Sequence, residues 1–258
     1  MDTQQQDKRL YLIDAYSLIY RSYYAFIRNP RYNSKGMNTS AAFGFINGLV
    51  EVINKRKPTH IGVAFDSPAR TFRNDIYEDY KANREETPED IKLAVPYIQK
   101  IVKAFNIPVI EMPGYEADDI IGTLSYQAGK KGFTTYMMTP DKDYAQLVDN
   151  KTFIYKPKGS GTEAEIIGRK EILEKYGIDE PMQVIDIMAL WGDTSDNVPG
   201  VPGVGEKTAM KLIAEYRNVE NLIEHAHQLK GKLKEKIEAN KEMILISKEL
   251  VSIILDVP

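Results

Sequence analysis

The feature that most constrains the fold is a short unit that recurs four times, in which an apolar β-forming run ends in acids and a helical segment follows. The runs are "LYLID", ending at Asp14, "HIGVAFD", ending at Asp66, "IPVIEMPGYEADD", ending at Asp119, and "FTTYMMTPDKD", ending at Asp143. Strands that alternate with helices predict an α/β fold with a mainly parallel sheet. In such sheets ligands bind beyond the carboxyl ends of the strands, so the acids are expected at the functional edge.

The densest group of acids lies in "GYEADDIIG", where Glu116, Asp118 and Asp119 stand directly before an apolar pair. On a helix Glu116 and Asp119 share a face, and Asp118 lies about a third of a turn away. If the place is partly desolvated, each like-charge pair about 4 Å apart repels by roughly 4 kcal/mol at an effective dielectric of 20. A cation must then offset the repulsion, or some groups stay protonated. The alternative is that acids simply favour a helix N-terminus.

Composition narrows the kind of metal. The 258 residues include no cysteine and three histidines, which excludes thiolate sites and disulfides and disfavours imidazole-based zinc chemistry. Oxygen ligands favour Mg²⁺, Mn²⁺ or Ca²⁺. The polar start "MDTQQQDKR" has no apolar signal segment behind it, and no apolar run approaches membrane-spanning length. We therefore expect a soluble cytoplasmic protein without a membrane partner.

A stretch rich in cations and aromatic residues, "ARTFRNDIYEDYKANREE", lies between the second and third strands. Its members recur at helical spacing and would form one stripe of a helix. The stripe consists of Arg73, Tyr77, Tyr80 and Arg84, with Lys81 beside it. Such a mixture is typical of a surface that binds phosphates and stacks on bases. The alternative is an ordinary amphipathic helix whose tyrosines pack inward.

After about residue 185 the character of the sequence changes, with the stretch "WGDTSDNVPGVPGVGEKTAMKLIAEY". Within it Asp193 and Asp196 are spaced to share a helical face. "GVPGVGEKTA" predicts a glycine-rich hairpin that opens a helix, whose free N–H groups can bind a phosphate. Its spacing matches neither a Walker A loop nor a dinucleotide fingerprint. The lysine-rich stretch from 228 to 250 is expected to be a solvated face.

The acids at predicted strand ends and helix starts form one set of nine. They are Asp14, Asp66, Glu116, Asp118, Asp119, Asp141, Asp143, Asp193 and Asp196. Nine carboxylates in one crevice require metal, and removing them from the 37 acidic residues leaves 28 against 34 basic ones, a balance of +6 that suits a polyanion. Two divalent ions about 3.5–4 Å apart would stabilise both the attacking and the leaving oxygen of a phosphoryl displacement. The residues alone thus predict a metal-dependent phosphodiesterase that acts on nucleic acid.

Four motifs sharpen this prediction: "EADDIIGTL", "DKDYAQLV", "YKANR" and "GDTSDNVPGVPGVGEKTA". They resemble the signatures of the 5′ nuclease family of flap endonucleases and 5′→3′ exonucleases, and most closely the N-terminal exonuclease domain of bacterial DNA polymerase I. The resemblance covers nearly the whole chain. It implies a PIN-like nuclease core over residues 1–185, with a helical arch at about 70–105. It also implies a helix-three-turn-helix (helix-hairpin-helix) subdomain with C-terminal helices over residues 186–258, which would bind the duplex backbone.

The resemblance also implies roles for individual residues. One Mg²⁺ or Mn²⁺ ion would be surrounded by Asp14, Asp66, Glu116 and Asp118, and a second by Asp118, Asp141, Asp143 and Asp196, with Asp119 and Asp193 acting through water. The scissile phosphate would be held by Lys81, Arg84 and Arg73. The expected DNA contacts are Tyr77, Tyr80, Gly203, Gly205, Lys207 and Thr208, with a K⁺ ion at the hairpin. Tyr80 would either stack on a base or pack in the arch.

One position departs from the family pattern. Pro140 stands where the family usually has glycine, and proline fixes φ and removes a backbone donor next to Asp141. The departure puts the local backbone in doubt but leaves the carboxylates in place. Because all nine acids are present, we expect an active enzyme.

The implied activity is hydrolysis of DNA at the junction of a 5′ flap with a duplex, together with removal of RNA primers from 5′ ends in replication and repair. We expect a monomer associated with the bacterial nucleoid. The end of the chain, "SIILDVP", reads like a cut before a polymerase domain, and a free-standing exonuclease is the alternative. Two other classes stay open: a non-catalytic nucleic-acid-binding module, and a PIN-type RNA endoribonuclease, for which the glycine hairpin would be superfluous.

Overall fold

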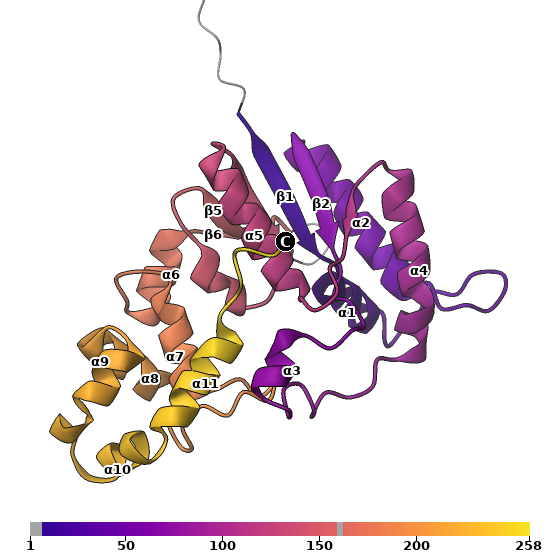
Figure 1. Ribbon diagram of the computed structural model, residues 1–258. Coiled ribbons are helices and arrows are strands. Elements are labelled where there is room, and N and C mark those ends of the chain that lie inside the picture. The colour runs from indigo at the N-terminus through magenta and orange to yellow at the C-terminus, as the bar shows by residue number, and fades with distance from the viewer. Residues whose placement is uncertain (1–6, 159–161) are drawn as a thin grey trace, which may run out of the picture.

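The computed structural model describes residues 7–158 and 162–258, and its centre is a six-stranded sheet in the order β3-β2-β1-β4-β5-β6 (Figure 1). The strands are β1 (Arg9–Asp14), β2 (His60–Ala64), β3 (Val109–Ile110), β4 (Thr134–Met138), β5 (Thr152–Lys156) and β6 (Glu165–Ile167). All neighbours pair in parallel except β5 and β6, which pair antiparallel. The predicted α/β fold with a mainly parallel sheet is therefore confirmed.

The four recurring sequence units correspond to β1, β2, β3 and β4. Their registers bring the strand ends level, because Asp14 pairs with Ala64 of β2 while Ile13 pairs with Met138 of β4. The acids that follow these strands consequently meet at one edge. Strands β5 and β6 were not predicted, since neither is followed by acids in the way the other four are.

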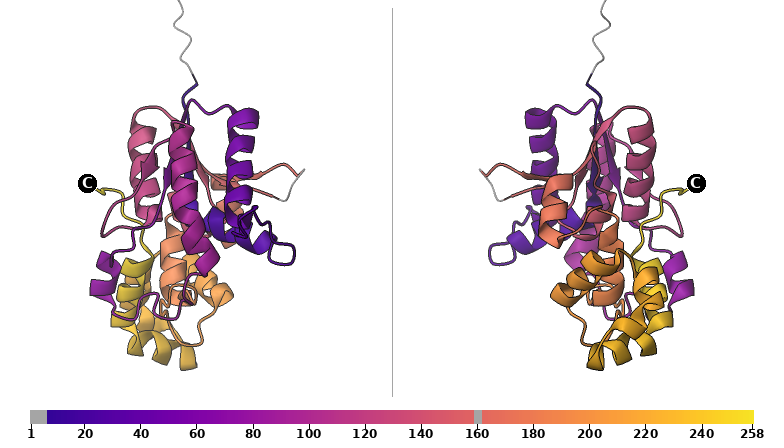
Figure 2. Two further views of the ribbon diagram at one scale, coloured as in Figure 1. Left: turned by 90° about the vertical axis from the view of Figure 1, so that its right-hand side faces the viewer. Right: turned by 90° about the vertical axis from the view of Figure 1, so that its left-hand side faces the viewer.

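Helices cover both faces of the sheet (Figure 2). Strand β1 shows why, because Leu12 points into one core while Tyr11 and Ile13 point into the other, with the period of two that a strand imposes. The second of these cores is closed by α1 (Ala15–Ala25), α2 (Ser40–Arg56) and α4 (Glu89–Ala104). The first is closed by α5 (Ala117–Lys130) and extends into the C-terminal helices.

The C-terminal helices gather beyond the carboxyl ends of the strands, in orange and yellow in Figure 1. They are α7 (Gln183–Trp191), α8 (Glu206–Tyr216), α9 (Val219–Glu224), α10 (Gly231–Ala239) and α11 (Lys241–Val251), with the 3₁₀ turn η2 (Ala226–Gln228). Helix α6 (Arg169–Tyr176) follows β6, and the 3₁₀ turn η1 (Asp143–Leu147) follows β4. The predicted boundary between residues 185 and 186 falls inside α7. One apolar core is continuous across that boundary. None of the helices in the described ranges combines the length and apolar character needed to cross a membrane.

The loop between α7 and α8 is folded so tightly that two glycines are required. A Cβ added to Gly200 would lie 2.4 Å from the backbone nitrogen of Gly192, and one added to Gly192 would lie 2.6 Å from the carbonyl oxygen of Val198. Both glycines also adopt positive φ angles. The loop that carries Asp193 and Asp196 thus has a fixed path.

The predicted helical stripe over residues 73–84 is wrong. Helix α3 (Phe72–Ile76) ends at Tyr77, which is extended, and Lys81 has a φ of 59°, so the residues beyond α3 follow turns. Helix α4, also within the range predicted as an arch, packs on the sheet through buried side chains such as Ile91 and Ile98. The part of that range that runs past the strand ends is residues 77–88, which we call the crossing segment.

The last residues run back along the sheet-containing part of the molecule, beside α5 (Figure 1). This C-terminal strap, residues 250–257, is held by side chains of the core. The backbone N–H of Ile254 donates to Asp119 at 2.9 Å, and that of Ile253 donates to Gln146 at 2.9 Å. Thr123 both donates to the Ile254 carbonyl and accepts from the Val257 N–H. The strap therefore belongs to the packed structure.

Candidate active site

A cavity of about 250 Å³ lies at the carboxyl ends of the strands. It is lined by seven of the nine predicted carboxylates: Asp14, Asp66, Glu116, Asp118, Asp141, Asp143 and Asp196. Strand ends supply Asp14 and Asp66, the start of α5 supplies Glu116 and Asp118, the turn after β4 supplies Asp141 and Asp143, and the α7–α8 loop supplies Asp196. Lys81 and Arg84 of the crossing segment line the same cavity. A hollow of about 370 Å³ adjoins it and shares these two cations.

Burial and mutual repulsion perturb the acids of this cavity. Burial, with the neighbouring Asp66, raises the pKa of Asp14 to about 6. Burial also raises the pKa of Asp118 and of Asp143 well above the usual aspartate range, and nearby carboxylates add to both shifts. The pKa values of Asp66 and Asp141 are raised mainly by burial as well. The lining of the cavity also contains seven carboxyl groups and only two cations among the described residues, Lys81 and Arg84.

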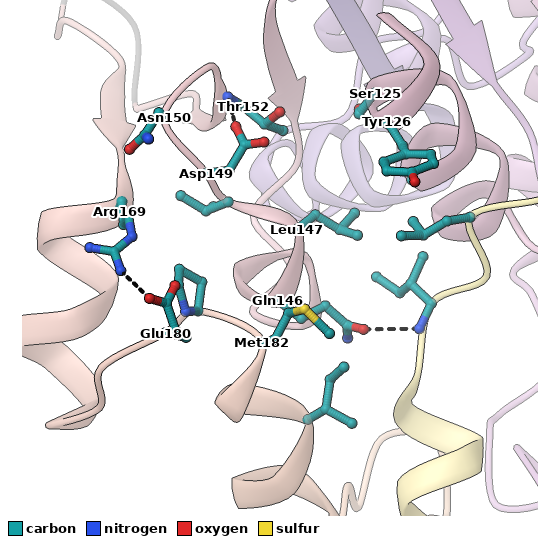
Figure 3. A pocket seen from close by; sticks show the side chains of 16 residues that line it. Ser125, Tyr126, Gln146, Leu147, Asp149, Asn150, Thr152, Arg169, Glu180 and Met182 are labelled. Carbon is teal, nitrogen blue, oxygen red and sulfur yellow. Dashed lines mark hydrogen bonds and ion pairs between the residues drawn. The ribbon is translucent and has the colours of Figure 1, made fainter. Parts of the chain in front are cut away.

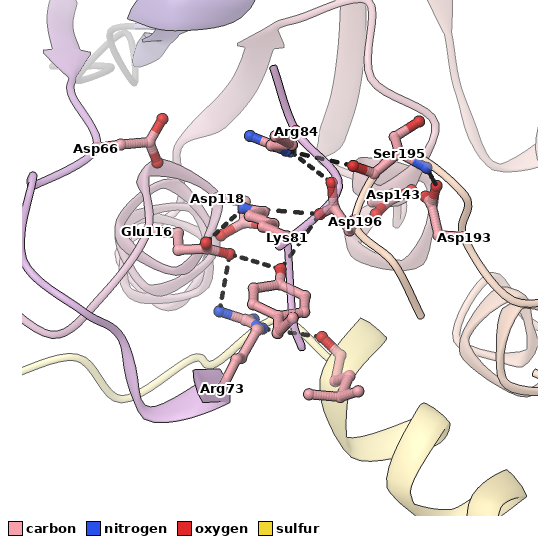
Figure 4. Close-up of polar contacts among 12 residues, drawn as sticks. Asp66, Arg73, Lys81, Arg84, Glu116, Asp118, Asp143, Asp193, Ser195 and Asp196 are labelled. Atoms are coloured by element: carbon pink, nitrogen blue, oxygen red, sulfur yellow. Dashed lines mark hydrogen bonds and ion pairs between the residues drawn. The ribbon is translucent and has the colours of Figure 1, made fainter. Parts of the chain in front are cut away.

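The donor set fits hard divalent cations. It consists of carboxylates, and among the residues that the structure describes the buried Oδ1 of Asp143 has no hydrogen-bond partner. In residues 7–158 and 162–258, however, no three acidic or histidine side chains are already spaced to hold one ion. Figure 4 shows that Lys81 lies between Glu116 and Asp196 and forms ion pairs with both.

Lys81 and Arg84 act together on Asp196. The Lys81 ammonium lies 3.6 Å from Asp196 Oδ2, and the Arg84 guanidinium pairs with Asp196 Oδ1. Burial would raise the pKa of Asp196, but the two cations outweigh it and hold that pKa below its usual value. Both cations are partly exposed, so they stand between the acids and solvent.

Tyr80 packs inside the protein, which settles the choice between its two predicted roles. Its side chain is 5% exposed, and its hydroxyl group lies 3.0 Å from a Glu116 oxygen and 3.2 Å from an Asp196 oxygen, donating to these carboxylates. It is therefore placed to orient two acids and not to stack on a base, and its predicted role as a DNA contact is corrected. Tyr77 is partly buried against the same core.

Arg73 and Asp119 form a sealed ion pair, which corrects both predicted roles. The Nη1 and Nη2 atoms of Arg73 donate to the two Asp119 oxygens at 2.7 and 2.8 Å. The remaining donors reach Glu116 Oε2 and the carbonyl oxygens of Leu250 and Ser252 in the strap. Arg73 is 1% exposed and Asp119 is 0% exposed. Arg73 therefore cannot reach a scissile phosphate, and Asp119 is engaged away from the cavity.

One of the three acids at the start of α5, Asp119, has the helix-capping role that was the alternative to metal binding. Asp119 accepts a hydrogen bond from the Glu116 N–H at 3.1 Å, and the two residues form a capping box at the start of α5. Glu116 both caps the start of α5 and contributes to the cavity. Its Oε2 accepts from Arg73 and Tyr80, while its Oε1 pairs with Lys81 in the cavity. Asp118 lines the cavity.

Asp193 lies beside the cavity lining and not in it. It is 4% exposed, pairs with Lys142 at 3.2 Å and accepts from the Ser195 N–H at 2.8 Å. Lys142 also lies 4.5 Å from the centre of the Trp191 ring, a contact that the sequence pattern did not reveal. These contacts fix the α7–α8 loop, and a water-mediated role of Asp193 at a metal stays a prediction.

Pro140 does not disturb the turn that presents the acids. The Asp141 N–H donates to the Thr139 hydroxyl at 3.1 Å, and the Asp143 N–H donates to Asp141 Oδ1 at 3.1 Å. Pro140 itself is exposed. The backbone N–H groups of Asp141 and Asp143 are therefore both satisfied within the turn despite the proline.

The predicted hairpin presents Gly203, Gly205 and Lys207 to solvent, with Thr208 partly exposed at the start of α8. Gly203 has a φ of 73°, and its carbonyl oxygen accepts a hydrogen bond from Lys236 of α10 at 3.1 Å. The lysine-rich stretch was expected to be only a solvated face, yet Lys236 contacts the hairpin. A long-range contact of this kind has no signal in local spacing.

A larger cavity, about 410 Å³, lies elsewhere, between α5, η1, the α6–α7 turn and the strap (Figure 3). Its lining mixes apolar side chains such as Leu147 and Met182 with the ion pair of Arg169 and Glu180. Of the described residues, none lines both this cavity and the acid cavity. The clustered acids and the perturbed pKa values identify the smaller cavity as the candidate active site.

Comparison with known protein families gives two matches that together span almost the whole chain. Residues 9–177 match the family described as "5'-3' exonuclease, N-terminal resolvase-like domain", and residues 179–258 match "5'-3' exonuclease, C-terminal SAM fold". DNA polymerase I of Bacillus subtilis is 43% identical over 252 residues, which cover 97% of this chain and 28% of that protein. The 5'-3' exonuclease of Aquifex aeolicus is 39% identical over 249 residues, covering 96% of this chain and 83% of that protein. The chain thus spans little more than a quarter of the polymerase relative.

Solved structures share the fold. T5 5'-exonuclease with bound divalent zinc ions has a TM-score of 0.75 at 21% identity, and the match covers 95% of this chain and 89% of that one. The catalytic core of Rad2 in complex with DNA substrate has a TM-score of 0.59 at 18% identity, covering 97% and 81% of the two chains. These likenesses agree with the PIN-like core and the helical C-terminal part described above.

Proposed function

The chain belongs to the 5'-3' exonuclease family, and from that premise we propose that it is a metal-dependent, structure-specific 5′ nuclease that hydrolyses phosphodiester bonds of DNA. The observation that carries the proposal is the cavity in which seven acids converge beside two cations of the crossing segment. Its activities would be 5′→3′ exonuclease and 5′-flap endonuclease.

Mg²⁺ or Mn²⁺ is the proposed cofactor, with two ions at each site. Asp14, Asp66, Glu116 and Asp118 would hold one, and Asp118, Asp141, Asp143 and Asp196 the other. Two such ions, when bound, supply charge stabilisation to the attacking and leaving oxygens of the phosphoryl transfer. The raised pKa values of the acids support this assignment, because carboxylates that repel one another gain most from a cation.

Lys81 and Arg84 would bind the scissile phosphate. In the free protein they pair with Glu116 and Asp196, so their charges already face the cavity. With other cations bound at these acids, the ammonium and guanidinium groups would be available to a phosphate oxygen. Cations that are fixed in place before the reaction stabilise the charge that develops in the transition state.

The exposed hairpin at residues 200–205, with Lys207 and Thr208, would bind the backbone of the duplex. The substrates would be DNA with a 5′ flap or a 5′ end at a duplex junction, and RNA primers paired with DNA. We place the protein in bacterial replication and repair, as a monomer at the nucleoid whose chain continues into a polymerase domain. The polymerase I relatives support that continuity, since the match covers only part of their length.

A K⁺ ion at the hairpin is the finer part of the cofactor proposal. The Gly203 carbonyl already accepts from Lys236, so an ion there would share or displace an ammonium group. Duplex binding measured in KCl and in choline chloride, for the wild type and Lys236→Met, tests it. A preference for KCl that grows in the variant supports the ion, and equal binding in both salts for both proteins contradicts it.

Cleavage of a labelled 5′-flap duplex is the test of the proposed function. We expect incision near the junction in Mg²⁺, none in EDTA, and none for Asp118→Asn in Mg²⁺, with duplex binding in Ca²⁺ retained. Asp75→Asn is the matched control, because Asp75 is an exposed acid of α3 outside the cavity lining. Binding without incision by the wild type would indicate a non-catalytic module, and faster cutting of unstructured RNA would indicate an endoribonuclease.

A further inference from the structure

The crossing segment and the α7–α8 loop are joined by two reciprocal asparagine side chains. Asn83 Nδ2 donates to the Thr194 carbonyl oxygen at 2.7 Å, and Asn197 Nδ2 donates to the Asp79 carbonyl oxygen at 2.7 Å. Each asparagine therefore belongs to one segment and bonds the backbone of the other. We call Asn83, Asn197 and their two carbonyl partners the asparagine clasp.

The clasp brackets the residues that carry the proposed chemistry. Asn83 stands between Lys81 and Arg84, and Asn197 directly follows Asp196. A backbone bond from the Lys81 N–H to the Asp196 carbonyl oxygen, at 2.9 Å, lies between the two amides. Figure 4 shows Arg84, Ser195 and Asp196 at this junction. The Ser195 carbonyl oxygen accepts a hydrogen bond from Arg84 Nε at 3.4 Å.

The junction holds two backbones in costly conformations. Lys81 has a φ of 59° and Asn197 a φ of 56°. A left-handed conformation costs most residues other than glycine roughly 1–2 kcal/mol, and asparagine less, so at Lys81 it persists only where the surroundings fix it. At Lys81 this conformation directs the side chain to Glu116 and Asp196. Bonds that secure the segment on both sides of Lys81 therefore secure the direction of its ammonium group.

Among the hydrogen bonds of the described residues, none joins an amide of the clasp to the carboxylates of the cavity. Both amides donate to backbone carbonyl groups, and within the described part of the chain neither side chain lines the acid cavity. Any effect on the reaction must therefore pass through Lys81, Arg84 or Asp196. The loop that carries Asn197 leads directly into the hairpin that is proposed to bind the duplex.

We propose that Asn83 and Asn197 are positioning residues, which fix Lys81 and Arg84 over the carboxylates and couple them to the loop that leads to the duplex-binding hairpin. This inference rests on the proposed nuclease function. Displacing a catalytic group by about 1 Å can cost on the order of 100-fold in rate. Loss of either amide should therefore slow the chemical step while duplex affinity and metal binding persist.

The variants are Asn83→Ala and Asn197→Gly, because glycine keeps the positive φ that alanine would strain. Asn240→Ala is the matched control, since Asn240 also donates its amide to a carbonyl, that of Lys236 at 2.8 Å, away from the cavity lining. We expect single-turnover cleavage of a 5′-flap duplex in Mg²⁺ to fall about 10- to 100-fold in both clasp variants. Duplex binding in Ca²⁺ and the melting temperature should stay close to those of the control.

The decisive readout is the same substitution in a Lys81→Met and in an Arg84→Met background. If the clasp acts through these cations, Asn83→Ala costs much less in at least one of the two backgrounds than in the wild type, because coupled residues are not additive. Equal costs in the wild type and in both backgrounds would overturn the proposal, as would wild-type rates in the clasp variants or a rate loss matched by lost duplex affinity. A wild type that leaves the flap intact would instead overturn the proposed function, and this role with it.

Discussion

Two clusters of cations and carboxylates lie on either side of Glu116, and they differ in their access to solvent. Arg73 and Asp119 form the sealed cluster, in which every donor of the guanidinium meets a protein acceptor. Lys81, Arg84 and Asp196 form the open cluster, whose cations are partly exposed at the rim of the cavity. Glu116 joins the two, because one of its oxygens faces each cluster.

The difference shows that sequence spacing does not distinguish a structural cation from a functional one. Arg73 and Arg84 were predicted to share a helical stripe and a role at the phosphate. Burial separates them, because a guanidinium that is 1% exposed has no free donor for a ligand, whereas that of Arg84 is 53% exposed on its side chain. Arg73 instead orients Glu116 toward the cavity.

The largest expected effect is on the sealed cluster. Arg73→Met would leave Asp119 charged and buried without its partner, and breaking a buried pair costs about 3–5 kcal/mol of unfolding free energy. At roughly 2–4 °C per kcal/mol for a chain of this size, the melting temperature in Mg²⁺ should fall by roughly 6–20 °C. Arg84→Met is the matched control and should change stability by less than about 1 kcal/mol. Equal shifts in the two variants would erase the distinction between the clusters.

The next effect is on the open cluster. Lys81→Met should lower the single-turnover rate of flap cleavage by about 10²–10³-fold, because it removes a fixed charge from the transition state. Duplex affinity in Ca²⁺ and the melting temperature in Mg²⁺ should stay close to wild type. A fall in melting temperature as large as that expected for Arg73→Met would show that the open cluster has a structural role too.

Metal removal is expected to lower the stability of the protein, because the acids of the cavity lose the ions proposed to bind there. Mg²⁺ at about 100 times its dissociation constant would stabilise the protein by about 2.7 kcal/mol relative to EDTA. Asp118→Asn should raise the melting temperature in EDTA, because it removes a carboxyl group whose pKa is raised by burial. The same substitution should reduce the increase in melting temperature that Mg²⁺ gives. Calorimetry with Asp75→Asn as the control checks both. A variant that melts lower than wild type in EDTA would show that the acids do not repel one another.

The smallest effect is expected at Pro140, which belongs to neither cluster. Pro140→Gly should lower the unfolding free energy by only about 0.4–1 kcal/mol, mainly because the unfolded chain becomes more flexible. The cleavage rate should stay within about twofold, since the Thr139 hydroxyl and not the backbone at 140 bonds the Asp141 N–H. A large loss of cleavage would mean that the proline itself sets the geometry of Asp141 and Asp143.

Local patterns predicted the strand ends well, because Asp14 and Asp66 follow runs whose burial and β-branching are readable within a few residues. They failed where partners are distant in sequence. Arg73 bonds the carbonyl oxygen of Leu250, 177 positions away, and Asn83 bonds that of Thr194, 111 positions away. No spacing rule reports such pairs, so neither the sealed cluster nor the clasp could be predicted. Strands β5 and β6 were missed because they lack the acids that marked the others.

The C-terminal strap gives the molecule a mechanical property. Its carbonyl groups at Leu250 and Ser252 accept from Arg73, and its N–H at Ile254 donates to Asp119, so the end of the chain is anchored in the sealed cluster. Tension applied beyond Val257 would first load the bonds of Thr123 to Val257 and Ile254, then those of Asp119 and Gln146, and then those of Arg73, before it reached any strand of the sheet. Once Arg73 was released, Glu116 would lose its support. Tension on the C-terminal strap would therefore disturb the acid cavity while the sheet was still intact.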